Sequence, residues 1–344
     1  MTPDRFFERG RLQSRHPRAA FARESFLARI ARLRGLGLEN AHTTAFLRSQ
    51  MEFHRTIAPL QMLELDGIAD GFALDLDDIW LHLHAGTLTD LQNNATLDDG
   101  CSALAANSPA DGPYVIKNRD LGGPVELVQI AQIHADGATG GMVVLGSLIA
   151  PSAYSSGMNR AGLALADTHV PVRHHRVGWL RYLLMGHLLD SCSDLAQTLA
   201  EIRNHPHCGG GTLEIIDKTG AAAAIELAST GPVIETGRLS HARSNHYLRP
   251  ETAEQSISFS KPEALLNSRG RINQLVRMTH NGALAPDIKS ARATMSSHGG
   301  PGEEGLCQHR SSVTLSCAVY SVRELTLEWT DGSPCCTPWQ KLQL

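Results

Sequence analysis

Residues 98–120 read DDGCSALAANSPADGPYVIKNRD, and this stretch predicts two strands joined by a tight turn. We expect the strands over residues 101–105 and 114–120, because Ser, Pro, Asp and Gly gather between them at 108–113. Gly100 places no side chain beside its own carbonyl, so the thiol of Cys101 can attack that carbonyl. Cleavage there would make Cys101 N-terminal, and its α-amine, with a usual pKa of about 7.7 to 8.0, could take the thiol proton.

The rest of the chain divides into a helical first part and a later part in which strands dominate. Helices are expected over 20–36, 43–58, 61–71 and 75–80, and a polar connector over 89–99 suits an exposed cleavage site. Beyond the hairpin, strands are expected over 126–134, 141–148, 163–168, 212–217, 221–227, 233–236, 312–321 and 324–330, and helices over 179–189, 193–202 and 262–278. Hairpin strands with helices grouped between them predict an α+β fold in which helices cover two stacked antiparallel sheets.

The composition is that of an ordinary globular protein. With 344 residues, 42% of them hydrophobic, the chain can bury a substantial core, and its net charge of -4 argues against a nucleic-acid partner. The Arg-rich start fits a solvated helix face, since residues 24–33 alternate apolar and cationic side chains at helical spacing. No run approaches the roughly 20 apolar residues of a membrane span and no secretory signal is visible, so we expect a cytoplasmic protein. Seven irregularly spaced cysteines suit reduced thiols, and no structural disulfide is expected.

A set of short motifs along the chain carries a family resemblance. In order, these are Gly100-Cys101-Ser102, Asn118-Arg119-Asp120, and the stretches at 157–163 (GMNRAGL), 216–220 (IDKTG), 244–246 (SNH), 268–271 (SRGR) and 306–309 (LCQH). Taken together, they resemble the N-terminal nucleophile (Ntn) hydrolases, in the branch that contains isopenicillin N acyltransferase and the linear amide hydrolases.

The resemblance implies a four-layer αββα sandwich and self-cleavage between Gly100 and Cys101. Residues 1–100 would form a mostly helical small subunit, and residues 101–344 would form the catalytic domain. The implied activity is hydrolysis or acyl transfer on a small-molecule amide through an acyl-thioester on Cys101, with no cofactor. Acyl-CoA would serve a transferase as a substrate. No membrane or nucleic-acid partner is expected, and assembly into homo-oligomers stays open.

The resemblance also implies roles for residues beyond the cleavage site. Asp120 ends the second strand of the hairpin, so strand pairing can bring it beside Cys101, where its carboxylate would orient the freed amine or contact the substrate. Asn245 would donate its side-chain amide to the oxyanion of the transition state. Three cations are the expected substrate-binding residues, with solvent-facing side chains as the alternative: Lys117, Arg271 and Arg310.

The chain departs from its relatives after the motif at 157–163. Many of them carry an Asn about eleven residues after the start of that motif, whereas residues 167–169 here read Asp-Thr-His. If the position uses its backbone N–H, nothing is lost. If it needs an amide side chain, Thr168 or His169 would have to replace it.

Two alternatives remain open. In a catalytically silent binding or scaffold homologue, Cys101 would be a buried and inert thiol, and the chain would stay unprocessed. A zinc hydrolase is more distant, because the 17 histidines and seven cysteines include neither paired C-x2-C ligands nor an H-E-x-x-H run, although Cys307 lies near His309. We therefore predict no metal site.

Overall fold

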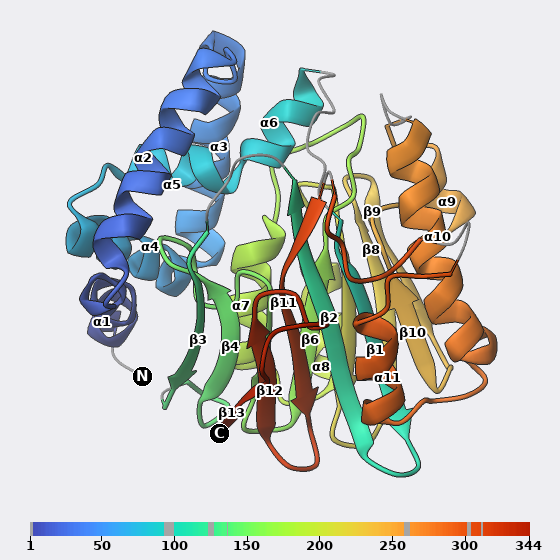
Figure 1. The fold of residues 1–344 in the computed structure, drawn as a ribbon. Coiled ribbons are helices and arrows are strands. Elements are labelled where there is room, and N and C mark those ends of the chain that lie inside the picture. Colours follow the sequence, from blue (N-terminus) through green and yellow to red (C-terminus); the bar gives the residue numbers. More distant parts are fainter. Residues whose placement is uncertain are drawn as a thin grey trace.

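Two antiparallel sheets lie face to face, and helices cover both of their outer faces (Figure 1). The computed structural model describes residues 3–92, 100–122, 127–135, 137–257, 262–300, 304–310 and 312–344. In its N-terminal part, residues 3–92 form helices and contain no strand. The predicted four-layer α+β sandwich with a helical first segment is therefore confirmed.

The predicted hairpin lies inside the six-stranded sheet, whose order is β10-β1-β2-β11-β12-β13. Its strands are β1 (Ser102–Ser108), β2 (Gly112–Gly122), β10 (Ser240–Arg243), β11 (Ser312–Ser321), β12 (Thr326–Asp331) and β13 (Gln340–Gln343). The turn between β1 and β2 closes at Gly112, where a φ of 78° favours glycine. β1 pairs with β10 on one side and with β2 on the other, so hydrogen bonds to neighbouring strands hold both edges of β1.

The seven-stranded sheet is a meander, because its strands pair in chain order from β3 to β9. They are β3 (Gln129–His134), β4 (Met142–Ser147), β5 (Ser156–Asn159), β6 (Leu163–Thr168), β7 (Thr212–Asp217), β8 (Ala222–Ala228) and β9 (Gly231–Thr236). The bounds of β6 and β7 are those predicted. The sequence analysis does not predict β5, which has only four residues.

Apolar contacts hold the four layers together. Between the sheets many side chains are small, such as Ala103 on β1 and Ala166 on β6, so the two sheets can lie close together. On the other face of the six-stranded sheet, Leu104 packs into a core formed with α10 (Pro262–Met278) and α11 (Ile288–Met295). The outer face of the seven-stranded sheet packs against α7 (Arg181–Ser191), α8 (Leu195–Asn204) and the N-terminal helices.

The N-terminal helices are part of the same body as the sheets. They are α1 (Pro3–Leu12), α2 (Ala19–Gly35), α3 (Ala41–Ile57), α4 (Pro59–Phe72), α5 (Leu76–Leu83) and α6 (Ala85–Leu91); short turns of helix lie at η1 (Gln13–Arg15), α9 (Pro250–Ala253) and η2 (His280–Gly282). Arg9 on α1 donates to the carboxylate of Asp190 on α7 at 3.2 Å. The side chain of Gln13 donates to the carbonyl of Ala150 at 2.9 Å.

These buried contacts join residues on both sides of position 100. Within the described ranges, no helix combines the length and the apolar character needed to cross a bilayer.

Candidate active site

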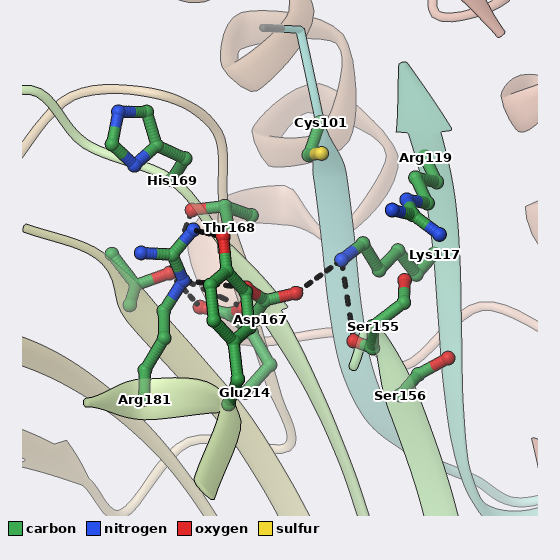
Figure 2. A network of polar contacts seen from close by, with 12 residues as sticks. Cys101, Lys117, Arg119, Ser155, Ser156, Asp167, Thr168, His169, Arg181 and Glu214 are labelled. Carbon is green, nitrogen blue, oxygen red and sulfur yellow. Dashed lines mark hydrogen bonds and ion pairs between the residues drawn. The ribbon is translucent and has the colours of Figure 1, made fainter. Parts of the chain in front are cut away.

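Cys101 lies directly before β1, where the chain enters the six-stranded sheet (Figure 2). Its side chain is among the residues that line a pocket between the N-terminal helices and the two sheets. The thiol donates to the backbone carbonyl of Asp120 at 3.9 Å. Cys101 is 8% exposed, so protein covers most of the residue although it lines the pocket.

The β1–β2 hairpin brings the carboxylate of Asp120 to the same place. Thr314 on β11 donates its hydroxyl to Oδ1 of Asp120 at 2.6 Å, which fixes the orientation of the carboxylate. A Cβ built on Gly100 would lie 3.3 Å from Oδ2 of Asp120 and 3.0 Å from the hydroxyl of Ser312. Gly100 therefore lies close to this carboxylate, and a larger residue at position 100 would displace its neighbours.

Arg271, on α10, binds the backbone of Cys101. Its guanidinium donates to the carbonyl oxygen of Cys101, to the hydroxyl of Ser102 at 2.8 Å and to Oδ1 of Asn245 at 2.7 Å. Burial lowers the pKa of Arg271, and the nearby Asp120 and Cys101 act in the opposite direction. Arg271 is 1% exposed and does not line the pocket, so in this structure the cation positions Cys101 and Asn245.

Asn245 follows the end of β10 and is also buried. Its side-chain Nδ2 donates to the carbonyl of His169 at 2.8 Å, and its backbone N–H donates to the hydroxyl of Ser268 at 2.9 Å. Because an amide nitrogen carries two hydrogens, one of them remains for another acceptor. Arg271 thus joins Asn245 and Cys101 in one network.

Lys117 faces the pocket on β2, and an acidic residue that sequence reasoning does not assign lies against it (Figure 2). Lys117 donates to Oδ1 of Asp167 and to the carbonyl of Ser155. Arg181 donates to Oδ2 of the same carboxylate at 2.6 Å. Burial by itself raises the pKa of Asp167, but the two cations outweigh burial and the pKa is lowered. Asp167, in the stretch 167–169 that departs from the family pattern, is therefore the shared counter-ion of two pocket cations.

Two further pocket cations have no carboxylate partner among the described residues. Arg119, on β2, donates to the side chains of Gln129 and Ser147 and lies 5.0 Å from the centre of the Tyr154 ring. Arg29, on α2, leaves its Nε without a hydrogen-bond partner. Both cations act with burial to lower the pKa of a shared neighbour, the buried His82. The pocket wall at α2 thus has an excess of positive charge.

An apolar recess adjoins this cationic wall. It is lined by residues of α2 and of the segment before β3, including Ala22, Phe26 and Val128, and it shares Arg29, His82 and Leu127 with the main pocket. Arg310, by contrast, is exposed and does not line the pocket, so the structure does not bring it to Cys101.

A four-layer sandwich with a cysteine at the head of an inner strand is the architecture of the Ntn hydrolases, and the sequence match is consistent with it. Residues 108–334 match the family model described as acyl-coenzyme A:6-aminopenicillanic acid acyl-transferase. The chain belongs to this family, whose members include amide hydrolases and acyltransferases of the Ntn type. The match begins at the end of β1 and so leaves Cys101 outside it.

Among solved structures, similarity is found at low identity. A mutant of conjugated bile acid hydrolase from Clostridium perfringens has a TM-score of 0.47 and 11% identity, covering 71% of this chain and 97% of that chain. Penicillin V acylase from Agrobacterium tumefaciens gives 0.37 and 11%, covering 71% and 86%. The Caenorhabditis elegans ortholog of N-acylethanolamine-hydrolyzing acid amidase gives 0.43 and 10%, covering 64% and 93%. No curated protein matches the chain in sequence.

Glu214 on β7, which Figure 2 labels, is buried, and it forms no ion pair with another described residue. The hydroxyl of Thr168 donates to the carbonyl of Ser244 at 2.6 Å and lies 2.8 Å from the hydroxyl of Thr212. If the Thr212 hydroxyl donates its one proton to Thr168, it has no proton left to donate to Glu214, whose oxygen lies 3.2 Å away. A hydrogen bond between Thr212 and Glu214 then requires a protonated carboxyl that donates to Thr212. Burial raises the pKa of Glu214 to about 8, which agrees with a protonated carboxyl at neutral pH.

We predict that Glu214 makes the protein less stable as pH rises. Folded Glu214 keeps its proton up to a pKa of about 8, whereas the unfolded group releases it near the ordinary value of 4.5. Stability is therefore lost between these values, by up to about 1.4 kcal/mol per pH unit. The substitution Glu214→Gln keeps the shape of the side chain but removes its ionisable group. Urea unfolding from about pH 5 to about pH 8 should show a shallower pH dependence in the variant, and parallel curves would contradict the protonated carboxyl.

Proposed function

We propose that this protein is a self-processing cysteine amide hydrolase or acyltransferase that acts on a small molecule. The observation that carries the proposal is that Cys101 and Asp120 line the same pocket, with the carboxylate of Asp120 close to Gly100. Membership of the acyl-transferase family supports the same chemistry.

Maturation would begin with attack by the Cys101 thiol on the carbonyl carbon of Gly100. The C–N bond then breaks, the proton moves to the departing nitrogen, and the acyl group remains on sulfur as a thioester. Water hydrolyses the thioester, which releases the carboxylate of Gly100 and restores the thiol. Cys101 is left with a free α-amine, which the carboxylate of Asp120 would hydrogen-bond.

Turnover would use that amine as the base. The amine takes the thiol proton, the sulfur attacks the amide carbonyl of the substrate, and the second hydrogen of the Asn245 amide stabilises the oxyanion. The protonated amine gives its proton to the leaving nitrogen. The acyl-thioester then passes to water in a hydrolase or to an acceptor amine in a transferase, for which acyl-CoA would be a donor substrate and not a cofactor.

Residues 1–100 would remain bound as the small subunit after cleavage and 101–344 would form the catalytic subunit. The Arg9–Asp190 ion pair and the hydrogen bonds of Gln13 support this, because they join the two parts at buried positions. We also propose a cytoplasmic protein with a small-molecule substrate and no nucleic-acid or membrane partner.

The pocket favours a substrate with an anionic group and an apolar group. Arg29 and Arg119 supply positive charge without a carboxylate partner among the described residues, while Asp167 is already shared by Lys117 and Arg181. An N-acyl amino acid has this combination, because its carboxylate could bind the two arginines and its acyl chain could enter the recess beside Phe26.

The test of the proposal is the covalent state of the purified protein. We predict cleavage between Gly100 and Cys101, which divides the 37.2 kDa chain of 344 residues into parts of about 11 and about 26 kDa that elute together. Cys101→Ala should stay intact and inactive. Cys192→Ala, at another buried cysteine, is the matched control and should process normally. An active wild-type protein that remains one chain in intact-mass measurements would sink the mechanism, and an intact, inactive one would favour the silent homologue.

A kinetic prediction separates two of the proposed roles. An oxyanion donor acts on charge that develops in the transition state, so Asn245→Ala should lower kcat by about 100- to 1000-fold and change KM much less. Asp120→Asn should change kcat and KM together and slow self-cleavage, because the carboxylate would orient the N-terminal amine. Each variant is first checked for complete processing. A kcat near that of wild type in Asn245→Ala would remove Asn245 from the reaction.

A third prediction concerns the charge of the substrate. Arg29→Gln should lower kcat/KM for an N-acyl amino acid by about 10-fold or more, the effect of losing one charged hydrogen bond. The matching N-acyl amine, which lacks the carboxylate, should be affected little. Arg32→Gln changes an exposed cation on the same helix and is the control. Equal losses on both substrates would argue against carboxylate binding by Arg29.

A further inference from the structure

Four metal-binding side chains meet at one place outside the pocket. His298 follows α11, Cys307 and His309 precede β11, and Cys335 lies between β12 and β13. Nε2 of His309 lies 3.2 Å from Nε2 of His298, 3.3 Å from Sγ of Cys307 and 3.3 Å from Sγ of Cys335. All four ligand atoms lie within 4.8 Å of one another.

We propose that these residues form a tetrahedral Cys2His2 site for a zinc ion. Zinc binds histidine nitrogen at about 2.0–2.1 Å and cysteine sulfur at about 2.3 Å, so neighbouring ligands in a tetrahedron lie about 3.3–3.8 Å apart. The contacts of 3.2 to 3.3 Å around His309 are close to the short end of this range. Two nitrogens and two sulfurs in tetrahedral positions are the ligand set that zinc prefers among divalent ions.

Hydrogen bonding does not account for the cluster. Nε2 of His309 has one lone pair or one proton, depending on the tautomer, so it can make one good hydrogen bond. It nevertheless has three polar neighbours at nearly equal distances. A cation between the four atoms would use one lone pair from each of them. Both cysteines are thiols here, so their sulfurs are available as ligands.

The prediction of no metal site rested on spacing along the chain, and folding changes that spacing. Cys307 and His309 are two residues apart, but the other two ligands come from segments on either side of β11 and β12. The three segments meet because β11 pairs with β12. After β12 the chain lies beside β11 again, where Ser333 donates to the carbonyl of Thr314, before β13 begins. Linear zinc motifs cannot reveal a site assembled in this way.

The surroundings point to a structural site that also supports the active site. Four protein ligands leave no open position for a water or a substrate, as in structural zinc sites. The backbone of Gln308, between two of the ligands, accepts from Thr314 N at 3.0 Å and donates to the hydroxyl of Thr314 at 2.8 Å. That same hydroxyl donates to Asp120. A zinc ion would thus fix the loop that orients the carboxylate beside Cys101.

The test is the metal content and stability of untagged protein grown with added zinc. We expect one zinc per chain in the wild type, a rise in the melting temperature when zinc is returned to chelator-treated protein, and loss of both in Cys307→Ser. Cys336→Ser changes the neighbouring exposed thiol, which lies outside the cluster, and should keep the zinc.

Titration of chelator-treated wild type with Co²⁺ makes the test independent of whether a variant folds. The intense visible absorption of tetrahedral cobalt with thiolate ligands should saturate at one equivalent and disappear when zinc is added. Wild-type protein with no more zinc than Cys307→Ser, or a reduced wild type that gives no cobalt–thiolate band, would overturn the proposal. Neither readout depends on catalytic activity, so failure here is distinct from failure of the proposed amide chemistry.

Discussion

The pairing of β1 with β2 is the constraint on which the site depends. Its register places Ser102 opposite Asn118, so the residue before β1 lies beside the end of β2, where Asp120 is found. A slip by one residue would turn every side chain of β1 to the other face. Ala103 would leave the core between the sheets and Leu104 would leave the core under α10, so burial on both faces fixes the register. The same burial therefore decides which carboxylate lies beside Cys101.

Buried charge is distributed unevenly around this hairpin. The side chain of Arg271 donates to the neutral oxygens of Cys101, Ser102 and Asn245, whereas two cations bind the carboxylate of Asp167. A guanidinium stays charged in a protein even when burial lowers its pKa, because its usual value is above 12. Removing a charge from water is costly unless hydrogen bonds offset the loss, and the bonds to Cys101, Ser102 and Asn245 do this. The result is a fixed positive charge against the backbone of Cys101.

The sequence predicts the long and regular parts of this fold and misses what depends on distant contacts. The bounds of β6, β7, α10 and β11 agree with prediction, because each has a clear apolar period and ends at turn residues. The short β5, β10 and β13 are too brief to show a period, and α1 forms at a polar stretch that packs on α4. At the site, the hairpin spacing and family motifs indicate Cys101 and Asp120. The partners of Lys117 could not be predicted, since the Asp167 carboxylate and the carbonyl of Ser155 reach it only when the two sheets stack.

An irregularity in β11 lies between the pocket at Cys101 and the cluster formed by His298, Cys307, His309 and Cys335. The pairing of β11 with β2 shifts between Thr314, opposite Asp120, and Ser316, opposite Arg119, so Leu315 is an extra residue in the ladder. Such bulges redirect side chains and are common near active sites. Here the bulge lies where Thr314 reaches Asp120 on one side and the backbone of Gln308 on the other. A regular β11 would move every residue before the bulge by one position relative to β2. The carboxylate beside Cys101 and the loop that carries Cys307 and His309 therefore depend on the same inserted residue.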